Sequence, residues 1–291
     1  YVELDAILAA KDGYGDDVPI DPDFHARRLP ESVWRRGGAF PAVESVILLH
    51  RLREVMALAG FTRLEAIAPD IDGEYDADLK PAAISLAADW FPAVENRGEG
   101  IFIQIRASAI RDWLARPAVV DRLQGLLGGF EAWKNKRKSR REFPGGPYLL
   151  LHTLSHLLIQ SMAMRCGYPA SSIRERVYSD TDGERYGVLL YTGSSDADGT
   201  LGGLVQQGRY IADHLEQAID MGTLCSNDPV CAEHDPATPF EDRPLHGAAC
   251  HGCVLVAETS CEMRNDLLDR ALVVPVMGRE GVEFFRNGDP A

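Results

Sequence analysis

The chain has 291 residues, of which 45% are hydrophobic and 25% are charged, and its formal net charge is −14. This length and composition predict a folded protein with a large core, arranged as one large domain or two smaller ones. The negative charge argues against binding of nucleic acid over the whole surface, because phosphate contacts require clustered lysine and arginine. A local basic patch is compatible with it. No membrane span is expected, since the longest apolar segments contain His, Arg or Glu.

The start of the chain carries no secretion signal. Tyr1 is not followed by a basic region, an apolar stretch and a small-residue cleavage site. We therefore expect a cytoplasmic protein, and we expect the chain to be a piece of a longer one. Metal binding is then a better explanation of clustered cysteines than disulfides are.

The first half of the chain predicts two helices and a strand. Residues 1–40 are rich in Asp, Pro and Gly without a clear period and are expected to form loops. The stretch PAVESVILLHRLREVMALAG predicts a helix from Pro41 to Gly60, because its apolar residues fit helical spacing. GEGIFIQI, residues 98–105, predicts a strand, and PAVVDRLQGLLGGF predicts a helix that begins at Pro117.

The second half predicts the longest helix, YLLLHTLSHLLIQSMAMRCG, ended by Gly167. After a short polar segment come a strand in YGVLLYTG, a turn in SSDADGTLGG, a helix in LVQQGRYIADHLEQAI and a late strand in ALVVPVM, residues 271–277. This mixture predicts an α/β or α+β fold, mixed helices and sheet with a four-cysteine zinc module near the C-terminus. We expect an N-terminal mixed region at 1–145, irregular at 1–40, and a second domain at 146–291.

Five of the six cysteines lie between residues 225 and 261. Cys250 and Cys253 are separated by two residues, and a pair at this spacing can reach one ion from a tight turn. Cys225 and Cys231 form a pair that can complete a tetrahedron, and four sulfur ligands suit Zn²⁺. These four are the predicted ligands. Cys261 is the alternative ligand, and His234, His246 and His251 are close enough to compete; disulfides and buried thiols are the other interpretations.

A closed four-sulfur site leaves no coordination position for water, so it would stabilise the fold rather than catalyse a reaction. Between residues 221 and 262 the chain has seven acidic residues and a single basic one, Arg243. Such a module should repel a phosphate backbone. We expect it to brace the fold or to face a protein partner.

His152 and His156 stand one helical turn apart in HTLSH, which is metal-ligand spacing. The Glu that zinc proteases place after the first His is missing, so a packed or hydrogen-bonded pair is the favoured interpretation. The competing class is an enzyme, a metal-dependent nuclease or phosphodiesterase that would use these histidines with Asp196 and Asp198 on a second metal. We expect a non-catalytic protein, because the sequence contains no P-loop pattern and no nucleophile elbow.

The stretch WKNKRKSRRE concentrates basic residues beside Trp133 in an otherwise acidic chain. One interpretation is a solvated face or mobile loop. The other is a patch for nucleic-acid phosphates, with Trp133 stacked on a base. The candidate nucleic-acid-binding residues are Lys134, Lys136, Arg137, Lys138, Arg140 and Arg141.

Several separate motifs carry a family resemblance: LLHRLREVMALAGFTRLE, WFPAVENRGEGIFIQI, LLHTLSHLLIQ, GYPASSIRERVY, GVLLYTGSSDADGTLGGLV and the cysteine segment. From about Pro41 onward the chain resembles the DrmB family, the helicase-associated subunits of the bacterial anti-phage system DISARM. The part from about Leu149 to Val274 is similar to the MrfA zinc-binding domain family, which accompanies DNA-repair helicases.

The resemblance implies a non-catalytic subunit that forms a heterodimer with a DrmA-like helicase and supports its DNA binding and ATP-driven translocation in phage restriction. DNA would be bound through the complex. It also implies that the zinc cysteines of the family correspond to Cys225, Cys231, Cys250 and Cys253. The chain departs from the usual domain by a long insertion between Cys231 and Cys250, which makes the first two ligands less secure.

Overall fold

A computed structural model of the chain describes residues 2–13, 23–35, 40–58, 60–61, 82–84, 89–167, 169–193, 203–238 and 243–286, apart from the side chain of Cys166. Asp196 and Asp198, which the sequence offered as metal ligands, lie outside these residues. None of the described helices combines the length and apolar character that a membrane crossing requires.

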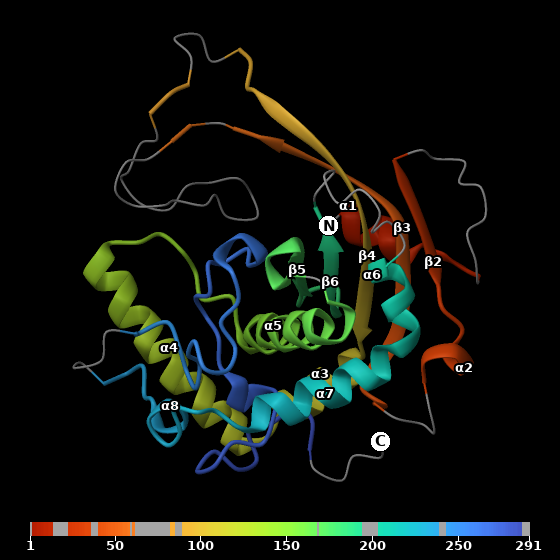
Figure 1. The fold of residues 1–291 in the computed structure, drawn as a ribbon. Helices are drawn as coiled ribbons and strands as arrows, with labels where there is room; N and C mark the ends of the chain where they lie inside the picture. The colour runs from red at the N-terminus through yellow and green to blue at the C-terminus, as the bar shows by residue number, and fades with distance from the viewer. Residues whose placement is uncertain are drawn as a thin grey trace.

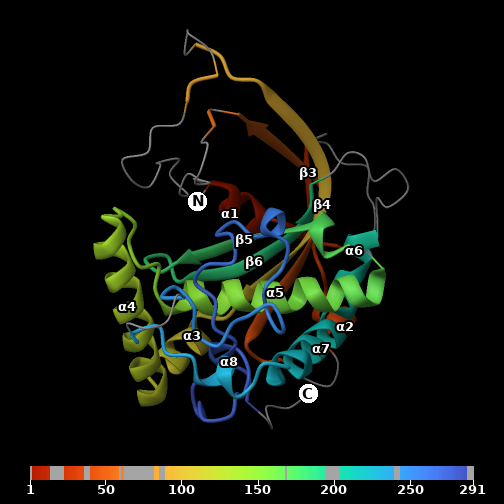
Figure 2. The same ribbon diagram turned by 60° about the vertical axis from the view of Figure 1, so that its left-hand side comes forward.

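One six-stranded sheet runs through the described residues in the order β1-β2-β3-β4-β6-β5. The β1–β2 pair is parallel and every other neighbouring pair is antiparallel. β3 and β4 are the long strands, and Figures 1 and 2 show them extending beyond the rest of the sheet. The strands are β1 (Lys11–Asp12), β2 (Phe24–Arg28), β3 (Val43–Ala57), β4 (Ala93–Ile105), β5 (Ile173–Asp180) and β6 (Arg185–Thr192).

The helices lie on both faces of this sheet. α5 crosses one face over β5 and β6 with α7 beside it, and α1 packs on the opposite face (Figures 1 and 2). The described helices are α1 (Val2–Leu8), α2 (Glu31–Trp34), α3 (Ala107–Leu114), α4 (Pro117–Arg137), α5 (Gly146–Cys166), α6 (Gly203–Gln207), α7 (Ile211–Thr223) and α8 (Val230–Glu233). Single 3₁₀ turns occur at Ala170–Ser172, Gly208–Tyr210, Glu258–Ser260 and Arg270–Leu272. The fold is α+β, as the sequence predicts.

α5 is the central helix of the molecule. All residues from Leu149 to Ile159 are buried, on every side of the helix. The helix ends where Gly167 adopts the left-handed conformation with φ of 70°, which glycine takes without steric cost. Because a helix surrounded by protein offers no water to its polar side chains, His152, Ser155 and His156 must find partners inside the core.

The helix predicted from Pro41 to Gly60 is wrong: this stretch forms β3. Ile47 and Leu49 point to the core that α1 closes, whereas Val46 and Leu48 point to the larger core under α5. Since both faces of the strand are buried at this end, apolar residues follow one another without the alternation that marks a half-exposed strand. A run of this kind fits helical spacing equally well.

Two further predictions are wrong. Residues 1–40 include α1, β1, β2 and α2 rather than loop alone, with Trp34 of α2 buried in the main core. The expected late strand in residues 271–277 is instead a 3₁₀ turn followed by irregular chain. Its apolar residues are core residues, and Leu272 and Val273 accept backbone hydrogen bonds from Phe284 and Phe285.

The strand at 98–105, the helix from Pro117, the helix ended by Gly167 and the strand at 186–193 are confirmed in β4, α4, α5 and β6. The predicted helix at 204–219 is present as α6, a 3₁₀ turn and α7. β5 lies in the segment that the sequence left as short and polar. The division at residue 145 falls between α4 and α5, and strands from both sides of it share the sheet; that division stays a prediction.

Asp269 joins the C-terminal segment to two helices. Its fully buried carboxylate accepts a hydrogen bond from Arg122 of α4 at 2.7 Å and another from the backbone of Ala248 at 2.9 Å. Its backbone N–H donates to the hydroxyl of Thr153 on α5 at 3.0 Å. The C-terminal segment, blue in Figures 1 and 2, therefore lies between α4 and α5 and is bonded to both.

We expect Asp269→Asn to lower the free energy of unfolding by about 3–5 kcal/mol, because the guanidinium of Arg122 is left buried without an opposite charge. Urea unfolding monitored by circular dichroism measures the change. The control is Glu184→Gln, which removes the exposed 2.9 Å ion pair with Arg111 and should cost less than about 1 kcal/mol. Equal effects of the two substitutions would contradict the assigned role of Asp269.

Candidate metal centre

Four cysteines converge after α7. Cys225 follows the end of that helix, Cys231 lies on α8, and Cys250 and Cys253 lie at the two ends of one turn in the following segment. Their four sulfur atoms all lie within 4.8 Å of one another. The predicted pairs are therefore brought together in space.

The separations of the sulfur atoms fit a tetrahedral zinc ion. The Cys225–Cys250, Cys231–Cys253 and Cys250–Cys253 sulfur distances are 3.4, 3.8 and 3.7 Å. Four sulfur atoms at about 2.3 Å from one Zn²⁺ are separated from each other by roughly 3.8 Å. The donor set and its dimensions therefore both suit zinc, which these residues would hold in a closed shell.

Backbone N–H groups point at the sulfur atoms, as expected where a thiolate carries negative charge. Asn227 donates to Cys225 at 3.4 Å and Gly252 donates to Cys250 at 3.3 Å, each from two positions further along the chain. A side chain at Gly252 would approach the hydroxyl of Ser226 to 2.8 Å, so glycine permits the close approach of the two turns.

The local electrostatics distinguish the thiols. The pKa of Cys231 is lowered to about 6, first by the hydrogen bond from the Cys253 thiol and further by those from other cysteines and by the charge of Arg270. Burial and the neighbouring thiols raise the pKa of Cys225 to about 11. Cys231 therefore forms the thiolate, which is the form that binds metal, more readily than Cys225 does.

Arg270 anchors the first pair of cysteines to the core. Its fully buried guanidinium donates to the carboxylate of Asp228 at 2.5 and 2.6 Å and to the carbonyls of Gly222 and Thr223 at the end of α7. Asp228 in turn accepts a hydrogen bond from the backbone of Ala232 in α8. The loop with Cys225 and Cys231 is thereby bonded to the 3₁₀ turn that Arg270 begins.

The other candidate ligands lie elsewhere. His234 and His246 place Nε2 at 3.0 and 2.8 Å from the carbonyl oxygens of Arg243 and Asn265, and His251 is exposed on the turn between Cys250 and Cys253. None of them belongs to either of the two metal-ligand groups found among the described residues.

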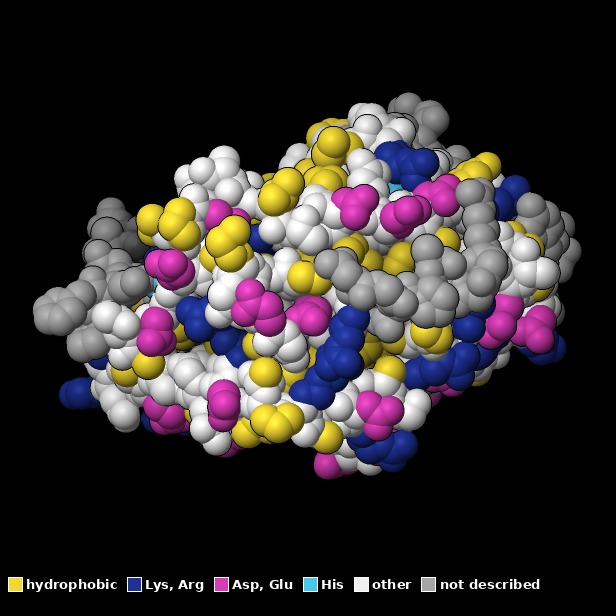
Figure 3. All heavy atoms as spheres, turned by 90° about the horizontal axis from the view of Figure 1, so that it is seen from below, with side chains coloured by type: hydrophobic (Ala, Val, Ile, Leu, Met, Phe, Trp, Pro, Cys, Tyr) yellow, Lys and Arg dark blue, Asp and Glu magenta, His cyan; other side chains and the backbone are white. Residues whose placement is uncertain are grey.

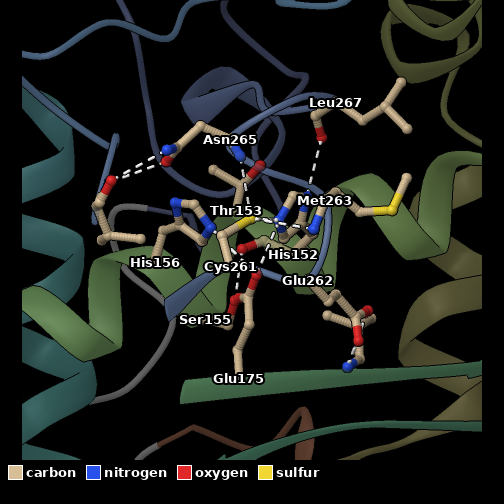
Figure 4. Close-up of polar contacts among 12 residues, drawn as sticks. His152, Thr153, Ser155, His156, Glu175, Cys261, Glu262, Met263, Asn265 and Leu267 are labelled. Atoms are coloured by element: carbon tan, nitrogen blue, oxygen red, sulfur yellow. Dashed lines mark hydrogen bonds and ion pairs between the residues drawn. The ribbon is translucent and has the colours of Figure 1, made fainter. Parts of the chain in front are cut away.

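Cys261, the alternative ligand, belongs to the second of those groups, together with His152, His156 and Glu175 (Figure 4). All four are buried, the two histidines with no exposed surface. Burial lowers the pKa of His152, but the charges of Glu175 and Cys261 outweigh it and the pKa is about 10. The group thus attracts positive charge.

The sequence did not identify Glu175, because β5 was not predicted. The signals were the pair of histidines one turn apart and a fifth cysteine without a place in a four-ligand site. In the structure both histidine Nε2 atoms lie within 3.2 Å of the same Glu175 oxygen. Both rings are fully buried, and Asp196 and Asp198, which the nuclease alternative also uses, lie outside the described residues.

The basic run begins in the last turn of α4. Lys136, Arg137, Lys138 and Arg140 are exposed, whereas Lys134 and Arg141 are half-buried, the latter 3.1 Å from the sulfur of Met263. Cationic side chains at this end of a helix also interact favourably with the helix dipole. Lys138 ends the helix in the left-handed conformation, at φ of 53°.

A four-sulfur centre of these dimensions, held by a helix and sheet scaffold, defines a structural zinc-binding domain. Residues 154–254 match the MrfA Zn-binding domain, and this match together with the four clustered cysteines identifies the cofactor as Zn²⁺. The chain is also 38% identical over 260 residues to the DISARM protein DrmB of Bacillus paralicheniformis, and the predicted resemblance is confirmed. The alignment covers 85% of this chain and 44% of that protein, so the chain spans less than half of the length of this relative.

We expect Cys250→Ser to release one equivalent of zinc per chain and to lower the free energy of unfolding by several kcal/mol. Structural zinc contributes about 10–16 kcal/mol in small zinc-finger peptides. Among the described residues from Cys225 to Cys253, the short helix α8 is the one element of regular secondary structure. Elemental analysis and urea unfolding measure the two effects. His234→Gln is the control, and it should keep its full zinc content; loss of zinc there would show that the ligand assignment is wrong.

Proposed function

We propose that this protein is an accessory subunit of a DISARM-type anti-phage defence system. It would bind a DrmA-like helicase and support the DNA binding and ATP-driven translocation of that motor, without catalysing a reaction itself. The observation that carries the proposal is the similarity to DrmB over 85% of the chain. The aligned length of 260 residues exceeds that of the zinc-binding domain at 154–254, so the similarity is not confined to that domain.

The chemistry of the zinc centre supports a non-catalytic role. We assign Cys225, Cys231, Cys250 and Cys253 as its ligands, and this set leaves no position for a water molecule that the metal could activate. Arg270 and Asp269 connect the zinc-bearing segment to α7, α4 and α5. The zinc centre therefore stabilises a rigid platform on which a motor subunit can dock.

The charge distribution supports contact with DNA through a local patch. Figure 3 shows the face that lies at the bottom of Figure 1, where basic and acidic side chains are interspersed. The net charge of the chain is −14, whereas surfaces that bind phosphate are positively charged. Contact with DNA is therefore expected at a local basic patch and not over the whole surface. The run from Lys134 to Arg141 begins in the last turn of α4, at the upper end of that helix in Figure 1, and it is the local patch that we propose contacts the DNA.

We expect the full chain to co-purify with a helicase subunit, in a one-to-one complex. Affinity purification of the tagged protein from its native host, followed by mass spectrometry and light scattering, tests this. Recovery of the protein without a helicase under conditions in which its zinc is retained would contradict the proposed function.

We expect the triple substitution Lys136→Gln, Arg137→Gln and Lys138→Gln to weaken DNA binding by the complex and to reduce its dependence on salt. Each lost phosphate contact lowers the slope of log affinity against log salt by about 0.7–0.9. Fluorescence anisotropy with labelled DNA across a salt series measures both quantities.

The matched control removes three exposed positive charges elsewhere, with Lys11→Gln, Arg97→Gln and Arg111→Gln. It changes the net charge by the same amount and should leave the salt slope unchanged. The same decrease in both triple variants would assign the effect to net charge, and the basic run would then be a solvated face.

A further inference from the structure

We propose that His152, His156, Glu175 and Cys261 bind a second zinc ion, separate from the four-cysteine centre. The inference does not depend on the proposed function. Two of the residues come from adjacent turns of α5, one comes from β5 and one follows the 3₁₀ turn at Glu258–Ser260 (Figure 4). Three separate segments therefore contribute to the site: α5 supplies two ligand atoms, and each of the other two segments supplies one.

The ligand atoms converge closely. His152 Nε2 lies 3.0 Å from the sulfur of Cys261 and 2.9 Å from Glu175 Oε1, and His156 Nε2 lies 3.2 Å from that same oxygen. A tetrahedral zinc ion with one sulfur and three nitrogen or oxygen ligands separates them by roughly 3.3–3.6 Å. The observed distances are slightly shorter, so small outward movements of the side chains admit the ion.

Both imidazole rings are oriented as in metal-bound histidine. Nδ1 of His156 lies 2.8 Å from the carbonyl oxygen of Val254, and Nδ1 of His152 lies 3.4 Å from that of Leu267. A carbonyl accepts a hydrogen bond, so each Nδ1 carries the proton and each Nε2 directs a lone pair toward Glu175. This outer hydrogen bond to a carbonyl is what fixes the tautomer of zinc-binding histidine.

The sulfur of Cys261 is surrounded like those of the four-cysteine centre. It accepts backbone hydrogen bonds from Met263 at 3.3 Å and from Asn265 at 3.1 Å. Met263 lies two positions after Cys261, just as the backbone donors Asn227 and Gly252 lie two positions after Cys225 and Cys250. Cys261 thus has the backbone environment of a zinc-binding thiolate.

Glu175 presents one oxygen to the site and is held by the other. Its Oε2 atom accepts a hydrogen bond from the hydroxyl of Ser155, which leaves Oε1 facing the two histidines (Figure 4). Two neutral imidazoles, one carboxylate and one thiolate carry two negative charges in total. Zn²⁺ neutralises them, as a site with no access to water requires.

A network held together by protons alone fits less well. Each ring faces an oxygen acceptor at Nδ1 and the Glu175 carboxylate at Nε2, so hydrogen bonds at all four nitrogen atoms to an ionised Glu175 require both rings to be positively charged. Their centroids are 4.7 Å apart inside the core, where two like charges repel strongly. One divalent ion binds both Nε2 atoms, Glu175 Oε1 and the Cys261 sulfur without that repulsion.

The first test uses the unaltered full chain, purified without chelators. Elemental analysis should give two zinc ions per chain. X-ray absorption at the zinc edge should show a mixed shell, because five sulfur and three nitrogen or oxygen ligands shared by two ions average 2.5 and 1.5 per zinc. A single zinc with a shell of sulfur alone would overturn the proposal, whether or not the protein binds a helicase.

The second test uses variants. His156→Gln and Cys261→Ser should each reduce the zinc content from two to one, and the remaining zinc should have a sulfur-only shell, which shows that the four-cysteine centre is intact. His214→Gln is the matched control, since His214 is an equally buried histidine that contacts Ser161 and Gln207 instead. It should retain both ions. Retention of two ions in His156→Gln and Cys261→Ser would contradict the assignment of these ligands.

Discussion

The structure depends on one constraint: α5 is surrounded by protein over its central turns and yet carries polar side chains. A buried polar group without a partner costs about 1–3 kcal/mol, and a buried charge costs more. His152 and His156 are satisfied by Glu175 from the sheet and by carbonyls of the C-terminal segment, and Thr153 accepts the backbone N–H of Asp269. Polar contacts as well as apolar surface therefore determine which segments pack against each side of α5.

The C-terminal half has little regular secondary structure after α8, and its conformation rests on buried charges and cysteines instead. Arg270 and Asp269 are neighbours in sequence, and each bonds a different part of the molecule: Arg270 the end of α7 and Asp228, Asp269 the helix α4. The sulfur centre lies between these connections. A segment of this kind reaches a single conformation because several independent groups constrain it at short intervals.

The sequence was sufficient to predict α4, α5, β4 and β6, because each has a start or stop signal such as Pro117 or Gly167 and a clear period. It was also sufficient for the clustering of the four cysteines, since spacing alone implies shared coordination. It was insufficient for β3, which is buried on both faces at its first half, and for β5, where the buried Glu175 stands between Ile173 and Val177 and interrupts the apolar alternation. The meeting of Cys261 with Glu175 could not be predicted, because it results from tertiary packing across residues far apart in the chain.

The limits of the matched family domain have a practical meaning in this fold. Residues 154–254 begin within α5, after His152, and end before Cys261, Asp269 and Arg270. A fragment excised at those limits would lose β4, the neighbour of β6, and the two residues that hold the cysteine loops in place. In this chain the matched domain is thus smaller than the set of contacts that holds its cysteine loops, and residues on both sides of the domain supply the missing supports.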